Sequence, residues 1–585
     1  MENWVIKNIK ADFSEIMRES SVSEVLARCL VNRRYTEPDE INDYLNPKLE
    51  SLHSPLLMKD MKKACDILRD KINAGKKIRI IGDYDVDGVV STYLLYRTLT
   101  LIGAQVDYEI PDRIKDGYGI NIRMVEEAKI DGIDTILTCD NGIVAMEQIL
   151  KAKEYGMTVI VTDHHSLLEL QSGETQLPMA DAVINPKQPE CTYPFKGLCG
   201  AAIAYKLILA LLQNYNIPMK EAYEEEILSY TAIATVCDVM ELIEENRIIV
   251  KHGITLLKNT ENKGLLALMD VSQINKELLT TFHLGFVIGP CLNASGRLDS
   301  AKRGLELLLT EDGKEAVQMA SELRNLNDIR KEMTTENVQK AVSQVEEGPI
   351  QYDKVLVIYL EGCHESIAGI IAGRIKEKYH RPTIVLTDAE DGIKGSARSI
   401  EQYNMIEELS RHRELLTKVG GHPMAAGLSL LRENIEPLRV ALNEGTTLTE
   451  EMLVPKVAID ALLPMGYLSE DLVKELSRLE PYGKGNEKPL FAEKNLRIRS
   501  IFIIGNNSSG IRFLLENQYG KKLEAIYFGD VNTFFSYISD TYGKEEAERL
   551  KTGRGSSFLL TITYYPKINE YNGFKSVQLM IQNYR

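Results

Sequence analysis

The chain has 585 residues, of which 44% are hydrophobic and 26% charged, so it can form several globular domains. Its net charge of −16 argues against binding nucleic acid through overall positive charge, but permits a local basic groove or a site where metal ions supply that charge. No apolar run reaches the ~18 residues of a membrane span. The start lacks a secretory signal, and the eight cysteines include no CxxC pair, so a cytoplasmic location is expected.

Between residues 77 and 240 short apolar strands alternate with helices. Strands are predicted at 77–83, 104–111, 134–140, 157–163 and 181–186, and helices at 88–103, 121–130 and 143–155. This alternation predicts an α/β fold, in which a parallel sheet carries helices on both faces. Ligands of such sheets bind beyond the carboxyl ends of the strands.

Residues 310–346 are predicted to form one long helix that connects two domains. Its apolar positions keep helical spacing, and they are Val317, Ala320, Leu323, Leu326, Ile329 and Met333. Beyond it the α/β pattern returns, with strands at 354–360, 382–386 and 392–400 and a helix at 366–379.

The residues from about 453 onward predict a small, mostly β unit. Its strands are expected at 496–505, 511–517, 522–529, 557–568 and 574–584, with a helical insertion at 470–480. The pair Asn572-Gly573 is typical of a tight hairpin between the last two strands.

Carboxylates and imidazoles follow three of the predicted strands of the first sheet. The first strand leads into "GDYDVDG", the third ends in "CDNG", and the fourth ends in Asp163, His164 and His165. Asp238 lies in an otherwise apolar helix, "ILSYTAIATVCDVMEL". Crowded carboxylates are costly unless cations neutralise them, and carboxylate with imidazole suits Mn²⁺ or Mg²⁺. Two such ions would form a site for in-line displacement at phosphorus.

Two simpler interpretations compete with this metal site. A single Asp at a strand end is more often a helix cap than a catalytic group, and "DYDVDG" resembles a calcium-binding loop. The Glu that should close such a loop is absent, since that position is Leu94. The conjunction of three motifs at successive strand ends favours the metal site.

These motifs resemble those of the DHH phosphoesterase superfamily, which is named after the residues found here at 163–165. Within it the resemblance to the RecJ family covers nearly the whole chain, through segments such as "GPCLNASGRL", "KGSARS", "VGGHPMAAG" and "LEPYGKGNEKPLF". The resemblance implies a 5′→3′ exonuclease for single-stranded DNA with two Mn²⁺ or Mg²⁺ ions. The metal ligands it implies are Asp83, Asp85, Asp87, Asp140, His164 and Asp238, with Asp140 as the bridge.

The same resemblance implies further site residues. His165, Arg398 and His422 are the catalytic candidates, with His165 facing the scissile phosphate or orienting a ligand. The substrate-binding candidates are Asn293, Arg297, Gly420 and Gly421. The two adjacent glycines would permit close approach of the backbone to a phosphate. The simpler interpretation of Gly-Gly-His is a plain turn. The sequence departs from the family pattern at Cys291, where an Arg is usual, which puts one DNA contact in doubt.

The resemblance also implies a division into domains. We expect a lead-in segment at 1–50, a DHH domain at 51–309, a connecting helix at 310–346, a DHH-associated domain at 347–451 and an oligonucleotide-binding (OB) fold at 452–585. Expected partners are single-stranded DNA, single-strand-binding protein and a RecQ-type helicase in DNA repair and recombination, and no membrane.

Two other functions remain open from the sequence. One is a DHH phosphodiesterase for short oligonucleotides, cyclic dinucleotides or pyrophosphate, which would need only two domains. The other is a scaffold on a decayed DHH domain, which should have lost motif carboxylates that this chain retains.

Overall fold

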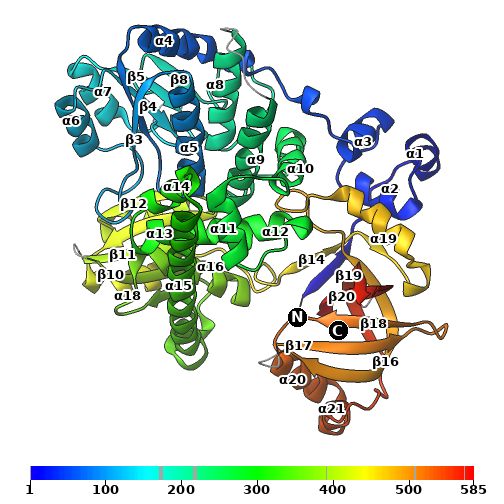
Figure 1. Ribbon diagram of the computed structural model, residues 1–585. Helices are drawn as coiled ribbons and strands as arrows, with labels where there is room; N and C mark the ends of the chain where they lie inside the picture. The colour runs from blue at the N-terminus through cyan, green and yellow to red at the C-terminus, as the bar shows by residue number, and fades with distance from the viewer. Residues whose placement is uncertain (1, 170–174, 215–220, 390–391, 506–508, 572) are drawn as a thin grey trace. The chain divides into compact units, whose positions relative to one another are not determined.

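The computed structural model describes residues 2–169, 175–214, 221–389, 392–505, 509–571 and 573–585. The chain forms two compact units, one of residues 49–454 and one of residues 1–48 together with 455–585 (Figure 1). Among the described residues, no helix is long and apolar enough to cross a membrane.

The unit of residues 49–454 contains the predicted parallel sheet. All its pairings are parallel, in the order β3-β2-β4-β5-β8, which confirms the prediction. The strands are β2 (Lys77–Ile81), β3 (Gln105–Glu109), β4 (Thr135–Cys139), β5 (Thr158–Thr162) and β8 (Ala182–Ile184).

Helices cover both faces of this sheet, as the sequence predicts. Successive residues of a strand point to opposite faces, so Ile160 joins the core of α5 and α8 while Val159 and Val161 join that of α6 and α7. The helices are α4 (Met61–Asn73), α5 (Val86–Leu101), α6 (Ile122–Ile130), α7 (Met146–Glu154) and α8 (Gly200–Asn214). Helix α7 begins three residues after its predicted start at 143.

A helical layer follows the sheet in sequence. It contains α9 (Glu221–Cys237), α10 (Glu244–Leu257), α11 (Lys263–Val271), α12 (Thr281–His283), the π-helix η4 (Leu284–Ile288), α13 (Gly289–Leu298) and α14 (Lys302–Leu309). The predicted helix "ILSYTAIATVCDVMEL" runs to Leu242 and is too long at its carboxyl end, so Asp238 follows the helix instead of lying within it. Helix α9 ends at Cys237, and Val239 takes a positive φ of 56° that cannot continue a helix.

One long helix, α15 (Gly313–Glu347), confirms the predicted connector. Its buried face differs from the predicted apolar stripe. Val317 and Ile329 are 52% and 39% exposed, while the polar Asn327 and Thr334 are fully buried against neighbouring elements. The predicted period is therefore correct, but the buried positions are partly polar.

The connector leads to a smaller α/β domain. Its sheet has the order β12-β13-β11-β10-β9. The elements are β9 (Leu356–Tyr359), α16 (Glu365–Tyr379), β10 (Thr383–Ala389), β11 (Gly392–Arg398), α17 (Met405–Arg411), β12 (Lys418–His422), β13 (Ala425–Leu430) and α18 (Ile435–Glu444).

The other unit contains the OB fold. Strands β16, β17, β18, β20 and β19 pair in that order, and β16 pairs with β19 to close the sheet. The strands are β14 (Lys456–Ile459), β15 (Ala461–Leu462), β16 (Phe491–Ile504), β17 (Gly510–Glu516), β18 (Lys522–Tyr527), β19 (Leu560–Tyr571) and β20 (Phe574–Tyr584). Tyr571 pairs with Phe574 as the hairpin requires, while Asn572 itself lies outside the described residues.

Several helices of this unit were not predicted. The insertion at α19 (Glu470–Leu476) is confirmed, but α20 (Val531–Tyr542) and α21 (Lys544–Lys551) are additions. The N-terminal residues belong here as well, because β1 (Asn3–Ile6) pairs in parallel with β14. Helices α1 (Phe13–Ser20), α2 (Glu24–Val31) and α3 (Pro38–Leu45) share the core of the barrel.

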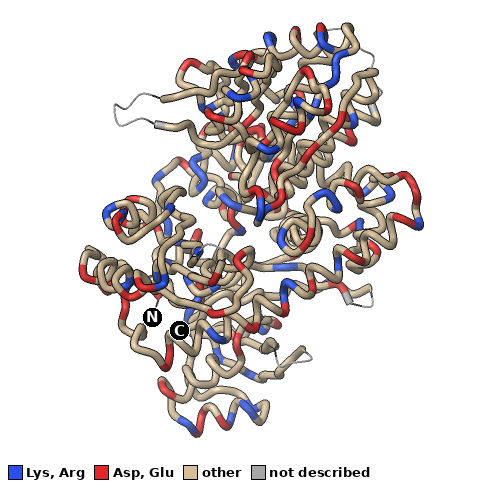
Figure 2. The backbone as a smooth tube through the Cα atoms, turned by 90° about the vertical axis from the view of Figure 1, so that its left-hand side faces the viewer, with Lys and Arg blue, Asp and Glu red and all other residues tan. Residues whose placement is uncertain are grey.

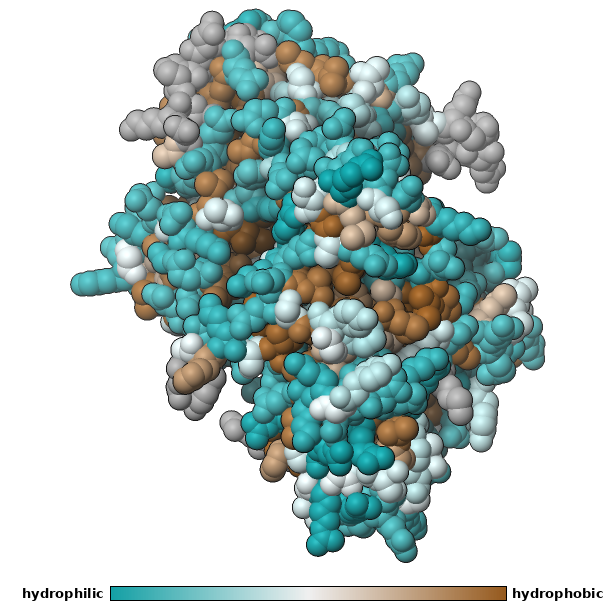
Figure 3. Space-filling view, turned by 90° about the vertical axis from the view of Figure 1, so that its right-hand side faces the viewer, coloured by the Kyte–Doolittle hydropathy of each residue, from teal (hydrophilic) through white to brown (hydrophobic). Residues whose placement is uncertain are grey.

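Basic and acidic residues are interspersed along the backbone rather than separated into one acidic and one basic region (Figure 2). The face drawn in Figure 3 is largely hydrophilic, with hydrophobic side chains gathered in patches.

Candidate metal centre

The predicted carboxylates meet at one edge of the parallel sheet. Asp140 and Asp163 directly follow β4 and β5, and Asp83 follows β2 by two residues. Because these strands are neighbours and parallel, their carboxyl ends lie side by side. Three groups each bring their ligand atoms within 4.8 Å of one another: Asp83, Asp85 and Asp140; Asp87, His164 and Asp238; and Asp140, His164 and His165. The structure therefore gathers all six predicted metal ligands.

Asp85 and Asp87 are fixed by backbone donors. Asp85 caps α5 and accepts from the N–H groups of Asp87 and Gly88, so the simple capping interpretation is also correct for this residue. The Asp87 carboxylate accepts from Gly200 and Ala201 at 2.6 and 2.8 Å. These donors form the amino end of α8, where the helix dipole favours negative charge.

Asp140 lies at the centre of the cluster. It is buried and has a positive φ of 61°, a strained backbone conformation for a residue with a Cβ. Its carbonyl accepts a 2.8 Å hydrogen bond from the Tyr118 hydroxyl. A Cβ atom on Gly200 would lie 2.6 Å from the Asp140 Cβ, so only glycine fits there. Packing of α8 thus holds Asp140 in place.

His164 points its Nε2 atom at three carboxylates. Nε2 lies 3.1 Å from Asp140 Oδ1, 3.6 Å from Asp238 Oδ2 and 3.7 Å from Asp87 Oδ2. Burial lowers the pKa of His164 to about 4, so the ring is neutral at pH 7 and can offer a lone pair. Both ring nitrogens and Asp140 Oδ1 are buried, and none makes a hydrogen bond with any described residue.

Asp163 orients its neighbours. Its Oδ1 accepts from the backbone N–H groups of His164 and His165 and lies 2.7 Å from His165 Nδ1, while Oδ2 accepts from Ile143 N–H. Although burial opposes it, these bonds hold the pKa of Asp163 below its usual value. The contact with Asp163 also outweighs burial at His165 and raises its pKa to about 9. Asp163 is therefore a positioning residue.

The cluster fits divalent cations. Burial, followed by repulsion from neighbouring carboxylates, raises the pKa of Asp83, Asp140 and Asp238 well above the usual range. Positive charge placed between these oxygens would reverse that effect. Carboxylate oxygens with one neutral imidazole are a donor set for Mn²⁺ or Mg²⁺.

Other predicted residues lie elsewhere in the same unit. Arg297 on α13 donates to the Ser366 carbonyl of α16 at 2.6 Å, and Asn293 lies one helical turn before it. Arg398 ends β11 and donates to Ser396 Oγ at 3.1 Å. Gly420, Gly421 and His422 are exposed on β12, and no interaction found among the described residues joins them to the carboxylates.

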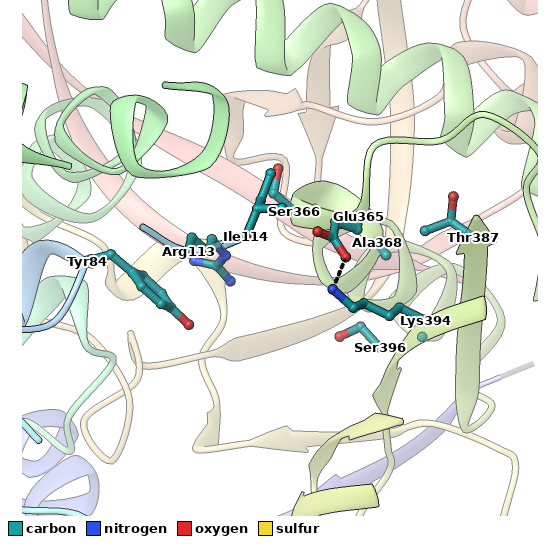
Figure 4. A pocket seen from close by; sticks show the side chains of 10 residues that line it. Tyr84, Arg113, Ile114, Glu365, Ser366, Ala368, Thr387, Lys394 and Ser396 are labelled. Carbon is teal, nitrogen blue, oxygen red and sulfur yellow. Dashed lines mark ion pairs between the residues drawn. The ribbon is translucent and has the colours of Figure 1, made fainter. Parts of the chain in front are cut away.

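Sequence reasoning missed a cavity of about 190 Å³ beside this cluster (Figure 4). Tyr84 and Arg113 line it from the first domain, with the guanidinium 4.6 Å from the centre of the Tyr84 ring. Ser366 and Ser396 line it from the second, beside the ion pair of Lys394 and Glu365. Tyr84 could have been suspected because it lies between Asp83 and Asp85. Nothing in the sequence around Arg113 indicated a place at this cavity, apart from its position after a predicted strand.

Burial and the nearby Arg113 lower the pKa of both Arg297 and Arg398. Arginines this close repel one another, so an anion between them would be stabilised. Cys291 does not take part, since it is buried and accepts a hydrogen bond from Asn327. The Arg that is usual in the family at position 291 is absent here, and the positive side chains near the carboxylates are Arg113, Arg297 and Arg398.

Three family models match the chain. The DHH family N-terminal domain matches residues 77–235, the DHHA1 domain residues 352–445, and the RecJ OB domain residues 459–583. The three matched ranges coincide with the parallel-sheet domain, the smaller α/β domain and the barrel.

Curated relatives match over nearly the whole chain. The single-stranded-DNA-specific exonuclease RecJ of Bacillus subtilis is 35% identical, over 99% of this chain and 70% of its own length. That of Haemophilus influenzae is 32% identical, over 92% of both chains. The crystal structure of RecJ in complex with Mn²⁺ from Thermus thermophilus superposes with a TM-score of 0.81 and 26% identity, covering all of this chain and 79% of the other.

Proposed function

This chain belongs to the RecJ family, and on that premise we propose that it is an exonuclease that degrades single-stranded DNA from 5′ to 3′ by metal-dependent hydrolysis. The observation that carries the proposal is the position of Asp140, whose carboxylate belongs both to the group of Asp83 and Asp85 and to the group of His164 and His165. A carboxylate that two neighbouring groups share can serve a pair of adjacent cations.

Two divalent ions, Mn²⁺ or Mg²⁺, fit these groups. Asp83 and Asp85 would hold one ion, Asp87, His164 and Asp238 the other, and Asp140 both. When bound, such ions make water more acidic and stabilise negative charge on phosphate oxygens. The chain contributes a fixed arrangement of oxygens, held by α8 at Asp87 and by Asp163 at the histidines.

The remaining side chains would bind and orient the phosphate. In the metal-free chain the contact with Asp163 raises the pKa of His165, which favours a ring that donates a hydrogen bond, and we propose that it donates to a phosphate oxygen. Arg297 and Arg398 would bind the same or the adjacent phosphate. We retain Asn293, Gly420, Gly421 and His422 as substrate-facing candidates, supported by the family resemblance alone.

The cavity of Tyr84 and Arg113 supports attack at a chain end. It lies between the loop that carries Asp83 and Asp85 and the elements that carry Ser366 and Arg398. Positive side chains there would hold a terminal phosphate and leave the next phosphodiester bond at the carboxylates. This arrangement favours an exonuclease over an enzyme that cuts within a strand.

We further propose the expected division into a DHH domain (51–309), a connecting helix (310–346), a DHH-associated domain (347–451) and an OB domain (452–585), after a lead-in segment (1–50). Single-strand-binding protein and a RecQ-type helicase are the proposed partners, in DNA repair and recombination. A cytoplasmic location is supported by the eight free cysteines.

The test is a degradation assay with Mn²⁺ on a single-stranded oligonucleotide labelled at its 3′ end, beside matched duplex and RNA. We expect progressive shortening from the 5′ end that EDTA stops. Asp140→Ala should reduce cleavage at least 100-fold, since it removes the shared carboxylate, and should leave DNA binding by the OB domain intact. Asp471→Ala, whose side chain is 95% exposed, is the matched control and should cleave normally.

Two results would contradict the proposal. Cleavage by Asp140→Ala at more than a few per cent of the normal rate would remove Asp140 from the centre of the site. Hydrolysis of dinucleotides or pyrophosphate with intact long DNA would retain the metal centre but assign it to a small-substrate phosphodiesterase.

A further inference from the structure

The helical run formed by α12, η4 and α13 has one open side. Along residues 281–298 the side chains that reach the surface include Phe282, Phe286, Pro290, Asn293 and Arg297, spaced by four, four, three and four residues. Residues at this spacing share one side of a helix. The opposite side is buried, including Leu284, Ile288, Cys291 and Leu292. We call this open side the α12–α13 stripe.

The stripe runs past the metal centre, because α13 packs on two segments that carry predicted ligands. Near its start, a Cβ atom on Gly289 would lie 2.3 Å from Sγ of Cys237, the residue before Asp238. Near its end, a Cβ atom on Gly296 would lie 2.6 Å from the carbonyl oxygen of Tyr84, between Asp83 and Asp85. The position of the stripe relative to the carboxylates is therefore fixed by backbone packing.

The far end of the stripe is an exposed aromatic pair. Phe282 and Phe286 are 59% and 69% exposed, and their rings stack with centroids 5.3 Å apart and planes at 22°. Single exposed apolar residues are common, but two stacked rings form an apolar patch that is a candidate binding surface. The π-helix η4 carries Phe286, and such single-turn insertions occur frequently at functional sites.

We propose that Phe282 and Phe286 stack on bases of the single DNA strand a few nucleotides away from the bond being cleaved; this inference rests on the proposed function. Phe286 precedes Asn293 by seven residues, roughly 10 Å along a helix at about 1.5 Å per residue. A strand advances roughly 3.4 Å per nucleotide when stacked. The aromatic pair therefore contacts bases about three nucleotides beyond the phosphate held by Asn293 and Arg297.

The position of the α12–α13 stripe beside the metal centre favours a nucleic acid strand as the ligand of Phe282 and Phe286. Between the rings and Arg297 the stripe stays partly exposed at Pro290 and Asn293, so a strand bound at the metal centre can follow it towards the rings. Aromatic rings bind unpaired bases of any sequence, because every base has a flat apolar face. Bases within a duplex are already stacked on their neighbours, so the pair also favours single-stranded substrate.

The experiment measures how affinity for DNA depends on its length. The full chain carrying Asp140→Ala is titrated with single-stranded oligonucleotides of about two to twelve nucleotides, with and without Phe282→Ala and Phe286→Ala. We expect the gain in affinity beyond about four nucleotides to fall by roughly 5- to 150-fold for each stacked base that is lost. Phe→Trp at both positions should restore the gain, and Phe→Leu should not.

A fluorescent base gives a second readout. A 2-aminopurine at the fourth or fifth nucleotide should be quenched on binding to the chain with both phenylalanines and remain bright with both alanines. Tyr352→Ala, which removes another exposed ring (86% exposed), is the matched control and should change neither readout.

Three outcomes would overturn the inference. One is unchanged length dependence and quenching in the double alanine variant. A second is an equal loss of affinity at all lengths, which would indicate damage to the metal centre. A third is a change in self-association without a change in DNA binding, which would identify the pair as a protein contact. The proposed function fails separately, if the unsubstituted chain leaves long single strands intact.

Discussion

Two buried aspartates at neighbouring strand ends have opposite roles. Asp140 leaves Oδ1 without a hydrogen bond to any described residue, whereas each oxygen of Asp163 accepts at least one. An accepted hydrogen bond does not by itself exclude a carboxylate from binding a cation, because both oxygens of Asp87 also accept one from the backbone. Asp163 differs from Asp140 because it belongs to none of the groups of potential ligands found among the described residues.

We expect Asp163→Asn to weaken Mn²⁺ binding roughly 10- to 100-fold, as loss of an orienting partner usually does. The amide can accept only through one atom, so it cannot hold His164, His165 and Ile143 together. Calorimetric titration with Mn²⁺ measures the change. Asp181→Asn is the control, because Asp181 binds Lys153 and Val159 before β8, away from the carboxylates, and its variant should bind Mn²⁺ normally.

The residues at the carboxyl ends of the strands could be located from the sequence, because each directly follows a strand that the sequence predicts. The carboxylates and imidazoles that follow the strands were expected at one edge in this way, since parallel neighbouring strands bring their ends together. Asp238 follows a helix instead, and the choice of the six proposed metal ligands came from the family resemblance. Tyr118 and Arg113 were not found, because a loop after β3 brings them to the site and no local pattern sets its path. Local sequence therefore predicts the ligands better than the residues that surround them.

At the scale of elements, secondary structure is also predictable only where the local sequence determines it. The strands of the parallel sheet, β9, β10, β11 and α15 carry their own periodicity, and the sequence predicted them within a few residues. Strands β12 and β13 of the smaller domain were not predicted. The buried face of α15 was missed because Asn327 makes its hydrogen bonds to Cys291 and Arg330, which a hydrophobic pattern does not reveal. The pairing of Asn3 with Lys456 joins distant parts of the chain and is likewise invisible locally.

The first residue of α8, Gly200, packs against Asp140 and holds this carboxylate in the candidate metal centre. We expect Gly200→Ala to weaken Mn²⁺ binding and to destabilise the fold by about 1–3 kcal/mol, because the added methyl group would overlap Asp140. Gly373→Ala in α16 is the control. Its Cβ meets nothing within 4 Å, so it should stabilise the helix by up to about 1 kcal/mol. Urea unfolding with and without Mn²⁺ measures both effects, and equal behaviour of the two variants would contradict the role of α8.

At the scale of the whole molecule, the crowded carboxylates link stability to pH. The pKa values of Asp83, Asp140 and Asp238 are raised in the folded chain, so without metal it binds more protons than the unfolded chain above about pH 4. Stability should therefore fall as pH rises through the raised pKa values.

We expect Mn²⁺ to raise Tm more at pH 8 than at pH 6, since the cation replaces those protons. Thermal unfolding followed by circular dichroism across this range, with Mn²⁺ or with EDTA, measures the difference. An equal shift at both pH values would mean that the carboxylates do not lose protons when the cation binds.

The division into two units predicts how the chain tolerates truncation. Residues 1–48 place Ile16, Leu26 and Leu30 in the same core as Phe491 and Phe513 of the barrel, so the first helices depend on the last domain. A chain of residues 1–454 would expose these side chains to water and should aggregate, while residues 49–454 should stay monomeric and bind Mn²⁺. Size-exclusion chromatography with light scattering compares the two. A monomeric 1–454 chain would show that the N-terminal helices can fold without the barrel.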